Sequence, residues 1–111
     1  MNIITNIPAA FNDTAQLFTA LGDPHRQRIL LSFEPLERMN ILQIVAANTL
    51  SRTAVTHHLK ILHHSGALSS EKIGKEVYFW INEPLIVQSL QNVITYLQSA
   101  SSNSVTKKII E

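Results

Sequence analysis

The sequence contains no cysteine. This excludes disulfides, thiolate metal sites and thiol-based redox sensing. The N-terminal stretch MNIITNIPAA has neither a basic region nor a long apolar run, so it predicts no signal peptide and no membrane span, and a cytoplasmic location is expected. A glycine-rich phosphate loop, a nucleophile elbow and clustered carboxylates are also missing, so an enzyme is the least favoured class of protein.

Charged residues are scarce as well. They make up 15% of the 111 residues, against 45% hydrophobic residues, which is typical of one globular domain with surface reserved for a partner or a second copy. The net charge of +1 does not by itself predict nucleic-acid binding. Locally, residues 51–76 carry four lysines and arginines against two glutamates, which concentrates positive charge in this part of the chain.

The stretch LSRTAVTHHLKILHH, residues 50–64, predicts an amphipathic helix. Ser51 is a suitable N-cap, and Val55, Leu59 and Leu62 recur at helical spacing on one face, which we expect to pack inward. Donor-bearing or small side chains, of the kind that contact phosphates and base edges in a DNA major groove, occupy the opposite face: Arg52, Thr53, Thr56, His57 and Lys60. A solvated helix surface is the alternative for this face taken alone.

The preceding residues predict a helix-turn-helix. After an irregular lead over residues 1–8, apolar spacing predicts a helix that ends at Gly22, with positive φ expected there. Asp23 and Pro24 then suit the cap and first position of a helix over residues 24–33. Residues 36–40 form a polar connector, and a short apolar helix over residues 41–47 is joined to the amphipathic helix by three residues.

The following residues predict a β-hairpin and a last helix. The apolar pattern changes to period 2 over residues 67–81, with Gly74 at the turn and Lys72 and Lys75 near the tip. Such a wing would contact the DNA backbone, although a charged hairpin tip is common without DNA. Residues 82–99 predict a helix whose apolar surface exceeds one face, so we expect the first and last helices to form a homodimer interface. A domain over residues 9–99 and a loosely ordered tail over residues 100–111 complete the organisation.

Three blocks in this order resemble the ArsR/SmtB family of bacterial repressors. They are LFTALGDPHRQRIL (17–30), SRTAVTHHLKILHHSGAL (51–68) and GKEVYFWI (74–81). The resemblance implies a mainly α (α+β) winged helix-turn-helix fold with about five helices and a two-stranded wing. It further implies a sequence-specific homodimeric repressor that binds an imperfect palindrome in double-stranded DNA, with base or phosphate contacts from one set of side chains: Ser51, Arg52, Thr53, Thr56, His57, Lys60, Lys72 and Lys75.

The chain departs from the family at its usual sensing sites. The positions of metal-binding cysteines in the family fall on Asn40 and Leu42, and residues 85–100 contain neither the aspartate nor the histidines of a second family site. No metal and no cofactor are therefore predicted, and the inducer stays open. His25 and Gln27 also depart from the small and apolar residues usual in the joint between the first two helices.

The histidines suggest an alternative. His57, His58, His63 and His64 are possible zinc ligands, but no pair has the i, i+4 spacing of a helical two-histidine site. His58 lies between Val55 and Leu62 around the helix, so it is expected to be a half-buried packing residue. A repressor that senses a metal or ligand at a non-standard site, and a winged-helix interaction module without DNA binding, remain the alternatives.

Overall fold

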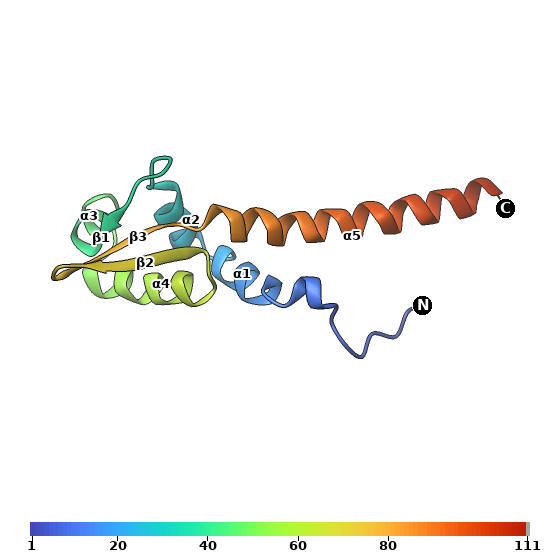
Figure 1. Ribbon diagram of the computed structural model, residues 1–111, viewed down its shortest axis with the longest axis horizontal. Coiled ribbons are helices and arrows are strands. Elements are labelled where there is room, and N and C mark those ends of the chain that lie inside the picture. Colours follow the sequence, from blue (N-terminus) through green and yellow to red (C-terminus); the bar gives the residue numbers. More distant parts are fainter. Residues whose placement is uncertain (111) are drawn as a thin grey trace.

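The computed structural model describes the backbone of residues 1–110 and the side chains of residues 1–100. Figure 1 shows a head from which one long helix projects. Residues 1–8 have no helix or strand. The elements are η1 (Ala9–Phe11), α1 (Thr14–Leu21), α2 (Pro24–Leu31), β1 (Met39–Asn40), α3 (Ile41–Ala46), α4 (Arg52–His64), β2 (Leu68–Ile73), β3 (Glu76–Ile81) and α5 (Glu83–Ile110). The predicted mainly α winged helix-turn-helix fold with five α-helices is confirmed.

The core of the head lies between the helices and the sheet. Val55, Leu59 and Leu62 of α4 are 0%, 2% and 0% exposed, which confirms the predicted inward face of this helix. They belong to one cluster with apolar side chains of the neighbouring elements, among them Leu17, Ile29, Ile44, Leu68 and Phe79. Burial of one helix stripe by every neighbouring element fixes how α4 is rotated about its axis, and thus which residues it exposes.

The joint between α1 and α2 differs from the expectation at Gly22. Its φ is −79°, so the predicted positive φ is wrong. The chain leaves α1 in a right-handed conformation and becomes extended at Asp23, so no left-handed residue is needed to end the helix. A Cβ at position 22 would lie only 3.0 Å from the carbonyl oxygen of Phe18. This close approach explains why glycine suits the position. The predicted cap is confirmed: the Asp23 carboxylate accepts from the backbone N–H groups of His25 and Arg26.

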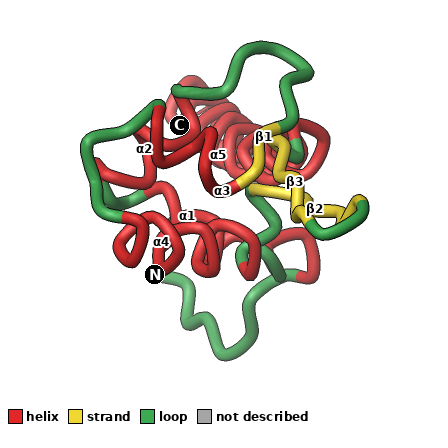
Figure 2. Tube along the Cα trace, turned by 90° about the vertical axis from the view of Figure 1, so that its left-hand side faces the viewer, coloured by secondary structure: helices red, strands yellow, loops and turns green. Residues whose placement is uncertain are grey.

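The sheet has three strands and not the two that were predicted. Figure 2 shows β1 beside β3, and the strand order is β1-β3-β2, with all pairs antiparallel. β1 lies within the stretch predicted as a polar connector, where Met39 pairs with Phe79 and is 6% exposed. Two residues are too few to show period 2, so the sequence pattern does not reveal this strand. The wing turn follows the prediction, since Gly74 has φ 63°.

α5 extends further than predicted. It continues to Ile110, so the end expected near residue 99 is wrong, because neither glycine nor proline after Pro84 interrupts the helical hydrogen bonds. The side chains of residues 101–110 and all of residue 111, which belong to the predicted tail, lie outside the described residues. Asn92 Nδ2 donates to Ala10 O at 2.8 Å, which ties η1 to α5. Within the described residues, every helix is too short or too polar to span a bilayer.

Candidate nucleic-acid interface

Two caps position the helix-turn-helix. Asn40 accepts from the N–H of Gln43 while the Gln43 side chain accepts from the N–H of Asn40, so a capping box begins α3. Ser51 Oγ accepts from Ala54 N at 3.2 Å and begins α4. The hydroxyl of Ser51 is thus a backbone acceptor, and only its proton is left for a phosphate. These local bonds, together with the buried stripe, present the polar face of α4 outward.

The structure brings five predicted site residues together on that face. Arg52, Thr53, His57 and Lys60 are exposed and Thr56 is half-buried. All five line one shallow cavity of about 410 Å³. Thr56 Oγ1 donates to Arg52 O at 2.8 Å, so its oxygen can only accept from a partner. The remaining side chains carry hydrogen-bond donors, which suit phosphate oxygens and the acceptor groups of base edges.

The two lysines of the wing are exposed. Lys72 lies on β2 and Lys75 in the turn to β3. Figure 1 shows the wing tip and the first turn of α4 at the same end of the head, away from both chain termini. All eight predicted site residues therefore belong to two elements at one end of the molecule, a placement that suits one helix in a major groove and a hairpin on the adjacent backbone.

Arg26 holds α4 against α1, a role that sequence reasoning missed. Its side chain is 9% exposed. Nε donates to Ala20 O at 2.8 Å, Nη2 to Thr19 O at 3.0 Å, and Nη1 lies 3.3 Å from Nδ1 of His58 on α4. The residue four positions after Ala20 is Pro24, which has no N–H, so the Ala20 carbonyl needs another donor. Pro24, four residues after Ala20, was therefore the sequence signal that could have indicated a side-chain donor for this carbonyl.

His58 is half-buried, as expected, and accepts the Arg26 hydrogen bond through Nδ1. Partial burial lowers the pKa of His58, and the neighbouring Arg26 lowers it further, whereas the Asp23 carboxylate raises it. Partial burial also acts to raise the pKa of Asp23, but the two N–H groups at the start of α2 and the Arg26 charge outweigh it, so this pKa lies below its usual value. A neutral His58 fits beside a guanidinium.

The other departures noted in the sequence have structural contacts. Gln27 Nε2 donates to Leu21 O at 2.6 Å, so α2 supplies donors to the last carbonyls of α1. Nη2 of Arg28 lies 2.7 Å from Nδ1 of His25. His63 Nε2 lies 3.0 Å from Ser70 Oγ on the wing. Among the described residues, no group of three histidines and carboxylates is placed to hold a metal ion.

The chain is similar to known proteins in both sequence and fold, although no family model matches it. The SmtB-homologue transcriptional repressor of Synechocystis sp. is 29% identical over 86 residues, which cover 78% of this chain and 64% of that protein. The repressor SdpR of Bacillus subtilis is 23% identical over 78% of this chain and 96% of its own. An ArsR-like regulator from Rhodococcus sp. RHA1 has a TM-score of 0.83 at 20% identity, covering 93% of this chain and 96% of that one.

The chain is therefore similar in sequence to SmtB-type and SdpR-type repressors and shares the winged-helix fold of an ArsR-like regulator. These relatives are regulators and not enzymes, in agreement with the prediction from the sequence. At the two positions where the resemblance led us to expect metal-binding cysteines, the chain has no thiol. Asn40 caps α3, and Leu42 is an apolar side chain that is 59% exposed. Residues 83–100 of α5 contain no aspartate and no histidine.

Proposed function

We propose that this protein is a cytoplasmic, sequence-specific transcriptional repressor that binds an imperfect palindrome in double-stranded DNA as a homodimer. The single observation that supports DNA binding most strongly is the outward polar face of α4. The core packing of α4 is made by its buried apolar stripe, whereas Arg52, Thr53, His57 and Lys60 on the polar face are exposed. The proposal that the protein represses transcription rests on the names of its relatives.

Roles within the interface follow from side-chain chemistry. Arg52, Thr53, Thr56 and His57 would contact base edges or the flanking phosphates, and Arg52 has the forked donors that suit guanine. Lys60 would contact phosphates further along α4. Ser51 would donate to a phosphate at the helix N-terminus, where the helix dipole favours negative charge. Lys72 and Lys75 would anchor the wing without specifying sequence.

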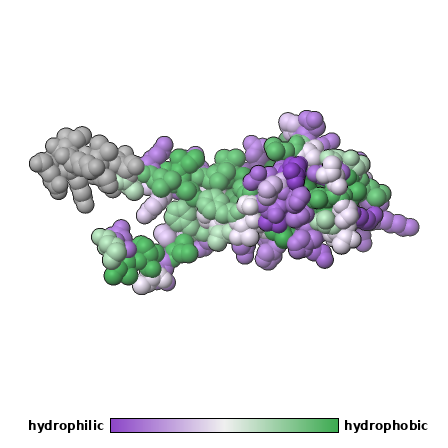
Figure 3. All heavy atoms as spheres, turned by 180° about the vertical axis from the view of Figure 1, so that it is seen from behind, coloured by the Kyte–Doolittle hydropathy of each residue, from purple (hydrophilic) through white to green (hydrophobic). Residues whose placement is uncertain are grey.

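The dimer proposal rests on an exposed apolar stripe along α5. Val87, Leu90, Ile94 and Leu97 are 55%, 36%, 46% and 58% exposed. Their spacings of three, four and three residues are those of a coiled-coil seam, which needs a second helix. Figure 3 shows hydrophobic side chains along the described part of α5, and hydrophilic ones gathered on the head. Phe18 on α1 is also 46% exposed and would extend the interface.

A two-fold dimer of this kind would present two copies of α4 to the same duplex. Symmetry then requires two inverted half-sites, separated by about 34 Å or one turn of B-DNA. The inducing signal is separate from this geometry. Since Asn40 and Leu42 carry no thiol, and residues 83–100 of α5 contain no aspartate or histidine, we propose that the repressor does not sense metal through the usual family sites.

Selection from a pool of randomised duplexes at moderate salt tests the proposal. We expect enrichment of one palindromic sequence, bound at least about 1000-fold more tightly than random DNA. A variant with Arg52, His57 and Lys60 replaced by alanine should enrich nothing, and unchanged circular dichroism should show that it is folded. If the wild-type protein also enriches no sequence, the interaction-module alternative replaces the proposed function. Zinc titration against a competing chromophore tests the metal-sensing alternative in the same preparation.

A further inference from the structure

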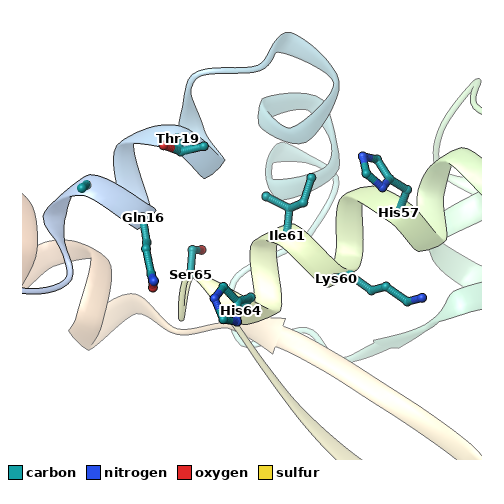
Figure 4. Close-up of a pocket in the computed structure, with 8 residues that line it drawn as sticks. Gln16, Thr19, His57, Lys60, Ile61, His64 and Ser65 are labelled. Carbon is teal, nitrogen blue, oxygen red and sulfur yellow. The ribbon is translucent and has the colours of Figure 1, made fainter.

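A groove of about 460 Å³ lies between α1 and α4. Ala15, Gln16 and Thr19 line it from α1, and side chains from the second turn of α4 to its C-cap Ser65 line it from the other side. Figure 4 shows Gln16 near Ser65 and His64 at one end, Ile61 between the two helices, and Lys60 and His57 on the turns of α4 farther from Gln16. No part of the predicted site, apart from His57 and Lys60, belongs to this groove.

The chemistry of the lining favours an organic anion. Ala15 and Ile61 provide apolar surface, while His57, Lys60 and His64 provide nitrogen donors. None of the lining residues is acidic. The volume lies within the range of about 300 to 1000 Å³ that is usual for small-molecule sites, which combine mostly apolar walls with a few placed polar groups. A carboxylate attached to an apolar body matches both parts of the lining.

The groove lies beside the proposed dimer surface and overlaps the DNA surface. Around α1, Phe18 lies about 100° from Thr19 but only about 60° from Ala15, so one edge of the groove adjoins the flank that carries Phe18. His57 and Lys60 also line the cavity formed by the polar face of α4. A ligand in the groove would therefore contact two residues that DNA also needs.

We propose that this groove binds a small aromatic or medium-chain carboxylate, and that its occupation lowers DNA affinity by engaging His57 and Lys60. The proposal of ligand binding is argued from the groove alone. The effect of the ligand on DNA affinity rests in addition on the proposed function. By linkage, an anion that binds the DNA-free protein better than the DNA-bound protein must weaken DNA binding by the same factor.

Calorimetry with 2-naphthoate, with the neutral 2-naphthamide as its matched compound, tests the binding step on the full chain without DNA. We expect a dissociation constant below about 1 mM for 2-naphthoate and at least about tenfold weaker binding of the amide. Amide-proton NMR shifts should concentrate at Thr19 and Ile61. Absence of saturable binding, equal affinity for the amide, or shifts confined to the apolar stripe of α5 would overturn the proposal.

Three variants locate the site. Ala15→Phe fills the groove from an exposed position and should abolish 2-naphthoate binding with unchanged thermal unfolding. Lys60→Met keeps the aliphatic chain and should weaken the naphthoate about tenfold while leaving the amide unaffected. Lys72→Met removes a lysine outside the groove and should bind the naphthoate like the wild type. Equal behaviour of Lys60→Met and Lys72→Met would contradict the assignment of the anion to this groove.

Fluorescence anisotropy with the selected duplex tests the link to DNA. Saturating 2-naphthoate should weaken DNA binding at least about fivefold for the wild type and not at all for Ala15→Phe. Ligand binding without any change in DNA affinity would overturn the regulatory half. If no duplex binds at all, the proposed function has failed, and the calorimetric result still decides whether the groove is an anion site.

Discussion

Replacement of Arg26 by methionine should strongly destabilise the fold. Methionine keeps the apolar stem of the side chain but removes three polar contacts of a residue that is only 9% exposed. Ala20 O would lose its donor, because Pro24 cannot replace it. Thr19 O would keep the N–H of Gly22 at 3.3 Å, so its loss is smaller. His58 would also lose the guanidinium contact that joins α4 to the α1–α2 joint.

The magnitude follows from these contacts. A hydrogen bond from a charged donor contributes about 1.5–3 kcal/mol, and a buried carbonyl left without a donor costs about 1–3 kcal/mol. Since the Thr19 carbonyl stays bonded and methionine still packs, we expect a loss of about 3 kcal/mol in the free energy of unfolding. Small domains have about 5–15 kcal/mol in total, so this loss is easily measured.

Urea unfolding followed by circular dichroism, at one protein concentration because of the proposed dimer, measures the effect. Arg28→Met is the matched control. Arg28 lies on the same helix and is exposed, and among the described residues its side chain hydrogen-bonds to His25, so its replacement should change the unfolding free energy by less than about 0.5 kcal/mol. If Arg26→Met were within about 1 kcal/mol of Arg28→Met, the role assigned to Arg26 would be wrong.

Three further predictions concern α5, pH and one glycine. Ile94→Glu should convert a dimer to monomers in analytical ultracentrifugation, whereas Gln88→Glu, exposed on another side of α5, should not; a dimeric Ile94→Glu would refute the proposed seam. The pKa of His58 is lower in the folded state than in the unfolded chain. The contribution of neutral His58 to the free energy of unfolding is therefore complete above about pH 6.5 and is lost as the pH falls through the lowered pKa. His58→Gln should flatten this part of the stability profile, and an unchanged profile would exclude the histidine as its source. Gly66→Ala should cost more than about 1 kcal/mol in urea unfolding, because φ is +83° and a Cβ would lie 2.7 Å from Leu85 Cδ1; a smaller loss would contradict this geometry.

Much of the fold was predictable from the sequence because its signals are local. The apolar spacing of Val55, Leu59 and Leu62 indicates both the helix and its buried face. Asp23 and Ser51 mark helix starts through bonds to neighbouring N–H groups. β1 was missed because a two-residue strand is formed by its partner β3 and has no pattern of its own. The length of α5 was missed because its serine-rich end suggested irregular structure, although neither glycine nor proline follows Pro84.

The site was predictable only where its residues follow a local sequence pattern. The outward face of α4 follows from periodicity, so its polar residues could be named from the sequence. The contact of Arg26 with His58 joins residues 32 positions apart, and it depends on the angle between helices that share no sequence pattern. The groove between α1 and α4 likewise exists only after those helices pack. Tertiary packing, and not propensity, creates both features.

The most direct test of the central claim compares Arg52→Ala with Lys75→Ala on the selected duplex and on random DNA. If α4 reads bases while the wing contacts the backbone, Arg52→Ala should lose about 1–3 kcal/mol on the selected duplex and little on random DNA, whereas Lys75→Ala should lose the same small amount on both. Equal losses for the two variants on every duplex would contradict the assignment of sequence reading to the polar face of α4.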